Sequence, residues 1–151
     1  DTILTGPAAS TQIRMVDDAR ISLKANTKFA IVAYQYVENI VTDIFSLSLI
    51  QGGFRTITGA IGDQKKEAYE ATISNFATIG IRGTDYEVVI TPAGEIFTGV
   101  YDVGNTIANA AEELDLVVGV DHDFATVPDP QTLDPTMMVV MPPLMLAPIP
   151  A

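Results

Sequence analysis

Short segments in which apolar and polar residues alternate recur along most of this chain, and they restrict the possible fold more than any other feature. In residues 43–50, apolar side chains at Phe45, Leu47 and Leu49 are separated by serines. An alternation of period two places the apolar residues on one face of a β-strand. Several such segments follow one another between turn residues, while helical periodicity is almost absent. The sequence therefore predicts an all-β fold.

Two segments need a choice between alternatives. Two glycines at residues 52–53 interrupt the alternating run, and we expect a bulge or sharp bend there, with residues 54–58 continuing the sheet. Residues 106–117 contain several good helix formers, which favours a helix. We prefer two short strands for this segment, because residues 115–120 return to β-type alternation. Residues 122–127 are predicted to form the last strand of the core.

The composition changes abruptly at Pro128. Seven of the nine prolines and four of the five methionines lie between this residue and the end of the chain. Proline cannot donate a hydrogen bond to a sheet, and the segment is too apolar for an ordinary solvated linker. We therefore divide the chain into a β domain of residues 1–127 and an apolar tail of residues 128–151. The tail, with a short strand at residues 136–141, is expected to pack against its own domain or against a neighbouring subunit.

The charge of the chain excludes two classes of partner. The formal net charge is −11, and every lysine and arginine lies at or before Arg82. Nucleic acid and anionic membrane surfaces repel a chain this acidic, so we exclude both as partners. The most apolar run, residues 137–151, is too short for a membrane span and contains prolines, so we expect no membrane insertion. Without cysteine, neither a disulfide nor a cysteine–metal site is available.

Residues 76–88 form the segment whose composition is hardest to explain by chance. Gly80 and Gly83 flank Arg82 between two β-type runs, and Asp85 begins the second run. Glycine permits turns and close backbone approaches, so the segment predicts a strand, a tight turn and a second strand. Arg82 is open to two interpretations, an anion-binding hook or a structural clamp on the turn. We favour the clamp, because arginine commonly fixes turns through bonds to carbonyl oxygens or carboxylates.

Residues 77–85, ATIGIRGTD, resemble the signature of the FecR-type domain, a bacterial extracytoplasmic β domain. Residues 52–60 are similar to a second family segment that reads G-x-F-R-x-x-T-G. The resemblance covers roughly residues 1–127 and departs from the family at residues 75–76, Asn-Phe, where Thr-Pro is common. It implies an antiparallel β-sandwich, a jelly roll or a β-helix-like domain, with an extended C-terminal tail.

The same resemblance sets expectations for function. Relatives with the full architecture carry a cytoplasmic anti-sigma segment and a membrane helix, and they relay signals from outer-membrane receptors. Neither segment is recognised in this sequence. We therefore expect a stand-alone version of the domain, located outside the cytoplasm and without known catalysis.

Residues with catalytic chemistry are scarce. His122 is the only histidine, and no serine motif of the nucleophile-elbow type accompanies it. We therefore predict no catalytic residue, no cofactor and no enzyme activity. Asp115, Asp121 and Asp123 are weak candidates for calcium ligands through their carboxylate oxygens. Because no loop with calcium-ligand spacing is present, a solvated acidic face is the preferred interpretation.

Two functions are open on these grounds. The leading hypothesis is a non-enzymatic, exported structural protein, extracellular or at the cell surface, whose partner is itself. We expect the domain to lack its first strand or to take it from another chain, and tail donation between subunits would build a filament or surface assembly. The predicted self-association anchors are Met137, Val139, Met141, Leu144 and Leu146. The alternative is a periplasmic or cell-surface binding or signalling module whose tail folds back on its own domain.

Overall fold

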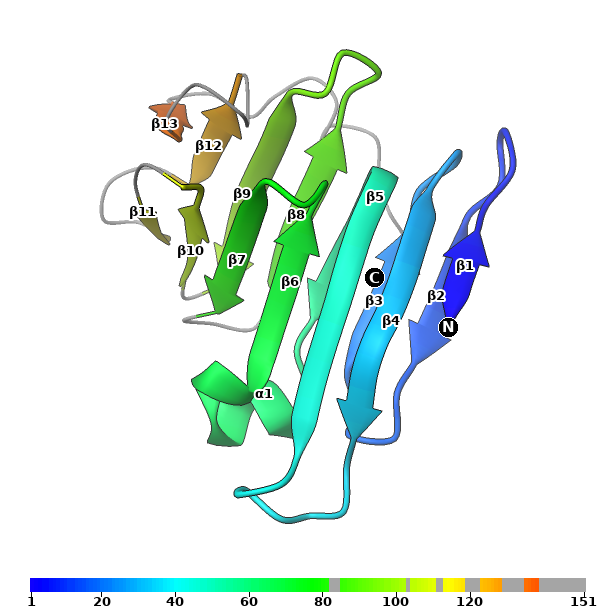
Figure 1. Ribbon diagram of the computed structural model, residues 1–151, viewed down its shortest axis with the longest axis vertical. Coiled ribbons are helices and arrows are strands. Elements are labelled where there is room, and N and C mark those ends of the chain that lie inside the picture. The colour runs from blue at the N-terminus through cyan, green and yellow to red at the C-terminus, as the bar shows by residue number, and fades with distance from the viewer. Residues whose placement is uncertain (82–84, 103, 111–112, 119–122, 129–134, 139–151) are drawn as a thin grey trace.

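Strand β5 (Ile44–Ile57) organises the fold, because its two halves belong to two different sheets (Figure 1). The computed structural model describes residues 1–81, 85–102, 104–110, 113–118, 123–128 and 135–138. The first half of β5 pairs with β4 (Lys28–Gln35) on one side and with β6 (Tyr69–Ile73) on the other. The second half pairs with β3 (Arg20–Leu23) and with β8 (Asp85–Ile90).

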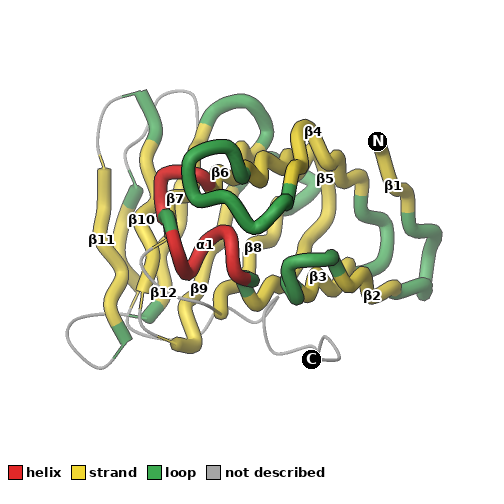
Figure 2. Tube along the Cα trace, turned by 90° about the horizontal axis from the view of Figure 1, so that it is seen from below, coloured by secondary structure: helices red, strands yellow, loops and turns green. Residues whose placement is uncertain are grey.

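Two layers extend from this shared strand and face each other (Figure 2). The first sheet has the order β1 (Thr2–Leu4), β4, β5, β6, β7 (Ala77–Ile81), β10 (Gly104–Ala108) and β11 (Glu113–Val117). The second sheet has the order β2 (Thr11–Arg14), β3, β5, β8, β9 (Ile96–Asp102), β12 (Phe124–Val127) and β13 (Thr136–Met138). The sheet as a whole therefore folds back on itself into a nearly closed, barrel-like form.

This architecture confirms the all-β prediction and corrects one part of it. Among the described strand pairs, β5 and β6 run parallel and the others run antiparallel, so the sheet is mixed and differs from the antiparallel sandwich that the resemblance offered as one alternative. A parallel neighbour needs a crossover connection. Here the chain returns to the start of β5 through α1 (Ala60–Gln64) and the short 3-10 helix η1 (Lys66–Ala68). A β-helix would need repeated parallel pairs, which the described strands do not form.

The bend in β5 lies at the two glycines, as the sequence predicted. Gly52 has a positive φ of 82°, a conformation that residues with side chains seldom adopt. A side chain there would also collide with Thr27. The Thr27 hydroxyl accepts a hydrogen bond from the N–H of Gly53 (3.0 Å) and donates to its carbonyl oxygen (3.1 Å). The backbone at the bend thus keeps its hydrogen bonds while β5 passes from one sheet to the other.

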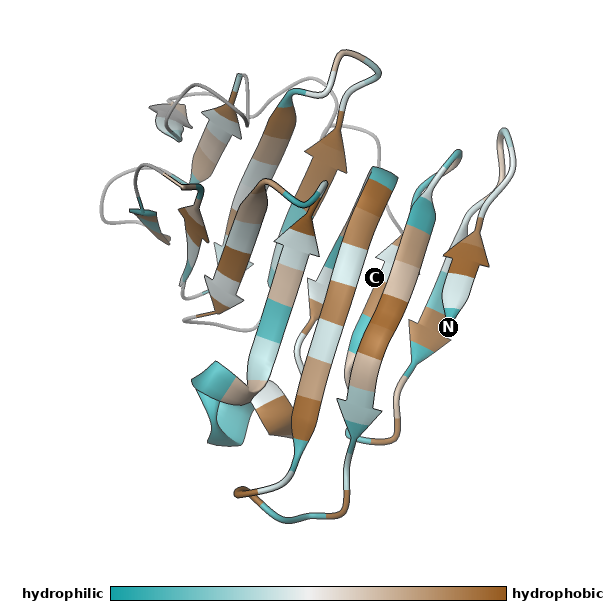
Figure 3. Ribbon diagram, in the orientation of Figure 1, coloured by the Kyte–Doolittle hydropathy of each residue, from teal (hydrophilic) through white to brown (hydrophobic). Residues whose placement is uncertain are grey.

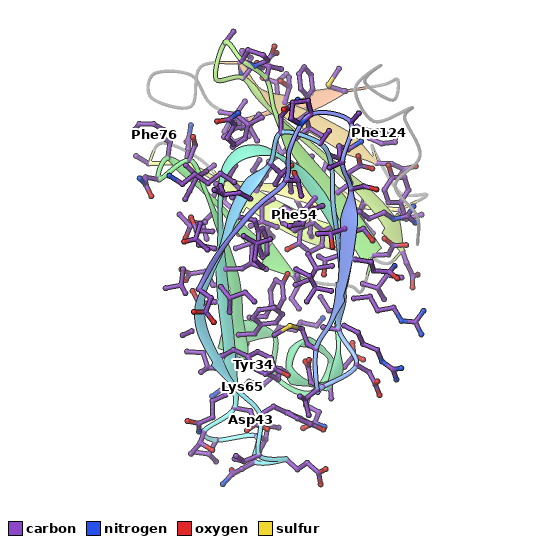
Figure 4. The ribbon with its side chains drawn as sticks, turned by 90° about the vertical axis from the view of Figure 1, so that its right-hand side faces the viewer. Tyr34, Asp43, Phe54, Lys65, Phe76 and Phe124 are labelled. Carbon is purple, nitrogen blue, oxygen red and sulfur yellow. The ribbon has the colours of Figure 1, made fainter. Side chains whose placement is uncertain are left out.

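The core lies between the two layers, where Figure 4 places Phe54. A series of aromatic rings crosses this core. Phe45 and Phe54, from the two halves of β5, are fully buried. Tyr69 and Tyr86 connect them through edge-to-face contacts, and the hydroxyl oxygens of the two tyrosines are 2.7 Å apart. The predicted alternation in residues 43–50 is confirmed, because its phenylalanine and leucines are buried while its serines are half-buried on the outer face (Figure 3).

The later strands agree with the preferred interpretation of the sequence. Residues 104–108 and 113–117 form the antiparallel pair β10–β11, not a helix. Strand β12, which corresponds to the last predicted core strand, pairs with β9. In the tail, β13 pairs with β12 of the same chain. Within the described part of the chain, no helix has the length and apolar character that a membrane span requires.

Candidate functional site

The described residues bring together no group of side chains suited to a metal ion. Among them, no three histidine, cysteine, aspartate or glutamate residues are placed to bind one. Asp115 lies exposed on β11 in the first sheet, whereas Asp123 directly precedes β12 in the second. Asp121 and His122 lie outside the described residues. The two described aspartates thus belong to different sheets, and the calcium site stays a prediction.

The signature segment carries the chain from one sheet to the other. Strand β7 pairs with β6 and β10, and β8 pairs with β5 and β9, so the two signature strands are not partners. Arg82 and Gly83 lie between them, outside the described residues, so the clamp role of Arg82 stays a prediction. At Gly80, an added Cβ would come within 2.8 Å of the Thr106 hydroxyl oxygen on β10. The absence of a side chain at this position therefore lets β7 and β10 lie close together.

The two family motifs meet in an ion pair that sequence reasoning missed. Arg55, from the segment 52–60, donates from Nε to Oδ1 of Asp85 (2.9 Å) and from Nη2 to Oδ2 (2.7 Å). Bidentate pairs of this kind are among the stronger side-chain hydrogen bonds. The bonds to Asp85 raise the pKa of Arg55, which keeps the guanidinium charged. Both residues stood in the recognised motifs, but the sequence does not show that β5 and β8 are neighbours.

A small network of charges surrounds this pair on the outer face of the second sheet. Tyr101 donates its hydroxyl to Oε2 of Glu87 (2.9 Å), and Nζ of Lys24 lies 2.7 Å from Oε1 of Glu87. The Arg55 guanidinium lies over the ring of Tyr101, 4.4 Å from its centre. Burial, and then the charge of Glu87, raises the pKa of Tyr101. Because these charges pair with one another, we interpret the network as structural support for β8.

An open hollow of about 530 Å³ lies beside the other signature strand, β7. Gly80 contributes no side chain to it, and Thr78 and Thr106 line it from neighbouring strands. Three glutamates and one lysine complete the charged part of the lining: Glu67, Glu70, Glu113 and Lys66. This excess of negative charge favours a polar or cationic group over an anion.

The loop between β4 and β5 exposes apolar side chains to solvent. Its hydrophobic residues colour the ribbon brown at the lower end of Figure 3. We call residues 36–43 the hairpin tip. Val37, Ile40 and Val41 are 62%, 51% and 77% exposed. One exposed aliphatic residue is normal, but three in one loop form a candidate contact surface. Sequence reasoning missed this surface, although two adjacent aliphatic residues in a turn are a visible signal.

The side chain of Asp43 fixes the conformation of the hairpin tip. Its buried carboxylate accepts hydrogen bonds from the N–H groups of Val37 and Asn39, each at 2.8 Å. The side-chain oxygen of Asn39 accepts a further bond from the N–H of Val41 (3.1 Å). Glu38 adopts a positive φ of 58°, which these local bonds have to maintain. The tip is therefore ordered by polar bonds, and its aliphatic side chains stay in solvent.

Comparisons with known proteins address the fold directly. Two crystal structures of a candidate anti-sigma factor from Parabacteroides distasonis ATCC 8503 are similar to this chain, with TM-scores of 0.67 and 0.66 at 12% and 11% identity. Both alignments cover 91% of this chain and 59% of the longer neighbour, so the chain spans less than two thirds of that protein. At this identity the likeness shows a shared fold. No curated protein matches the chain.

The family comparison agrees with the motifs. The model described as FecR protein matches residues 1–102, from the N-terminal strand to the end of β9. This range includes the bend in β5, both recognised motifs and both residues of the Arg55–Asp85 ion pair. The match covers more than half of the sequence. The chain belongs to the FecR family.

Proposed function

We propose that this chain acts outside the cytoplasm as a non-catalytic binding module that passes on a signal through contact with a second polypeptide chain. Its membership of the FecR family supports this proposal, and its structural neighbour is described as a candidate anti-sigma factor. The pairing of β13 with β12 of the same chain favours a tail that folds back on its own domain.

The hairpin tip is the observation that carries the proposal. Removing apolar surface from water in a contact contributes about 25 cal/mol per Å² to the free energy of association. A surface that is already ordered loses little conformational entropy when a partner covers it. The tip combines exposed aliphatic side chains with a backbone fixed by Asp43. A protein surface with an apolar pocket is the class of ligand that fits it.

Photo-crosslinking from the hairpin tip tests this function. A photoreactive phenylalanine in place of Val41, in cells that produce the full protein, is expected to form a discrete adduct with a polypeptide. The matched control is the same replacement at Val16, which is 79% exposed on the turn between β2 and β3 and is expected to form none. Recovery of the adduct from the periplasmic or surface fraction tests the location. Equal labelling at both positions, or none at Val41, would refute the proposal.

Self-assembly through the tail is a second proposal. Strand β13 forms one edge of the second sheet and has three residues, so the tail of a neighbouring copy can make the same pairing with β12 by exchange. Met137 lies in β13 opposite Ala125. The other predicted anchors lie outside the described residues: Val139, Met141, Leu144 and Leu146.

Deleting residues 136–151 tests the tail proposal by electron microscopy. We expect the full chain to form filaments or other large assemblies and the shortened chain to form none. If the shortened chain forms the same assemblies, or the full chain stays monomeric at high concentration, exchange of the tail is not the mechanism.

A further inference from the structure

We infer that the partner of the hairpin tip is a second copy of this chain, which receives the tip in an apolar hollow at the opposite end of the β4–β5 hairpin. This inference rests on the proposed function and names the ligand of the same surface. It differs from exchange of the tail, because neither contact surface includes residues after Gln51.

The receiving hollow lies where the turn after β1 meets the start of β4. It has a volume of about 260 Å³, and most of its lining is apolar. Leu4, which is 71% exposed, and Pro7 contribute apolar surface, while Lys28 and Gln51 border it with polar groups. Aliphatic side chains that enter the hollow would displace water from this apolar surface.

The walls of the hollow are preformed. The Thr5 hydroxyl donates to the carbonyl oxygen of Lys24 (2.6 Å) and accepts from the N–H of Thr27 (2.8 Å). The backbone N–H of Thr5 donates to the carbonyl oxygen of Thr27 (2.9 Å), and the N–H of Asn26 donates to that of Gly6 (3.2 Å). These bonds join the turn after β1 to the turn before β4. The hollow and the tip are therefore both ordered before they meet, which lowers the entropic cost of the contact.

The negative charge of the hairpin tip favours the hollow over a membrane surface as the ligand of the tip. Residues 36–43 carry Glu38 and Asp43 and no lysine or arginine. Anionic lipid therefore repels the tip. The hollow offers the exposed Lys28 as a counter-charge to Glu38. Opposite charges at the rim of an apolar contact fix its orientation and exclude wrong partners.

The position of the two surfaces determines the kind of assembly. β4 begins at the hollow and ends at the hairpin tip, so the two surfaces lie at opposite ends of one strand, the upper and lower ends of Figure 1. Figure 4 likewise places Asp43 at one extreme of the molecule. A contact between different surfaces is heterologous, so it propagates from copy to copy unless the rotation closes a ring. The contact is small, so we expect reversible, concentration-dependent association.

Analytical ultracentrifugation of the full chain tests this inference. We expect the unchanged protein to sediment faster as its concentration rises. Val41→Asp at the tip and Leu4→Asp at the hollow are each expected to lose this reversible, concentration-dependent association, while the control Val16→Asp associates like the unchanged protein. All of these positions are largely exposed, so the fold should tolerate the changes, and circular dichroism checks this.

Mixing the two defective variants gives the decisive result. Val41→Asp keeps an intact hollow and Leu4→Asp keeps an intact tip, so an equimolar mixture is expected to form dimers and nothing larger. Glu38→Lys and Lys28→Glu should each weaken association by up to about fivefold, the usual contribution of an exposed ion pair, and the two changes in one chain should restore much of it. A mixture that gains no dimer, or reversible association that persists unchanged in both single variants, would overturn the inference.

The outcomes also separate this inference from the proposed function. If the unchanged chain stays monomeric while Val41 crosslinks to a different protein, the second copy is the wrong ligand and the binding function stands. If Val41 forms no adduct and the chain does not associate, both proposals are wrong.

Discussion

Replacing Asp43 by alanine removes the carboxylate that orders the hairpin tip, while every aliphatic side chain of the tip stays in place. The lost groups are two hydrogen bonds of 2.8 Å, from the N–H groups of Val37 and Asn39. A hydrogen bond to a charged group contributes about 1.5–3 kcal/mol net, so the pair contributes about 3 kcal/mol at the lower end. Water can reach the loop and replace part of these hydrogen bonds, so we expect the free energy of local opening of the tip to fall by about 2 kcal/mol.

Hydrogen exchange measured by NMR detects this local loss. Since about 1.4 kcal/mol corresponds to a factor of ten, the amides of Val37 and Asn39 should exchange about 30-fold faster in Asp43→Ala. Asp43→Asn keeps one acceptor oxygen and should lose about 1 kcal/mol, which is about a fivefold change. Amides of β8, in the other sheet, are the internal control and should keep their protection, because the opening is confined to the loop.

The result also bears on binding. If an ordered tip is what makes the contact favourable, Asp43→Ala should weaken association of the chain although Val41 is unchanged. Unchanged exchange at Val37 and Asn39, or faster exchange throughout the chain, would refute the assignment of Asp43 as the local organiser of the tip.

Three further predictions concern the fold. Arg55→Lys keeps the charge but loses the bidentate geometry toward Asp85, so we expect the free energy of unfolding in urea to fall by about 1–2 kcal/mol. An unchanged free energy of unfolding would contradict the structural role of the pair. Gly80→Val should destabilise the chain by about 1–3 kcal/mol, and Thr106→Ala in the same chain should recover part of this because it removes the colliding hydroxyl. Burial raises the pKa of Tyr86 well above its ordinary value of about 10. Tyr86 therefore ionises at a lower pH in the unfolded chain than in the folded chain. The stability that comes from its buried neutral form is complete below about pH 10 and is lost as the pH rises further. In thermal unfolding, the midpoint of Tyr86→Phe should therefore fall less above about pH 10 than that of the unchanged protein.

Local patterns in the sequence predicted the strands well, and the reason is physical. Alternation in residues 43–50 specifies which side chains are buried without reference to any partner, because a strand repeats every two residues. The glycines at residues 52–53 marked the bend for a similar reason, since a positive φ is a property of one residue. The family motifs were recognisable because they are also short and contiguous.

Strand pairing needed the tertiary structure. The parallel pair β5–β6 depends on the bend that brings the end of β5 back beside its own start, and no local signal encodes that return. The ion pair between Arg55 and Asp85 depends in the same way on β5 and β8 being neighbours. For the signature segment, the sequence predicted two strands, and only the fold decided that they belong to different sheets.

The candidate contact surfaces show the same division. Composition, periodicity and short motifs are local properties, so they were enough to predict an all-β domain of the FecR family with a strong negative charge. The exposure of the aliphatic residues in the hairpin tip, and the hollow at the far end of the same hairpin, became visible in the folded chain alone. Exposure and the distance between two surfaces are set by how distant segments pack, and no stretch of sequence contains them alone.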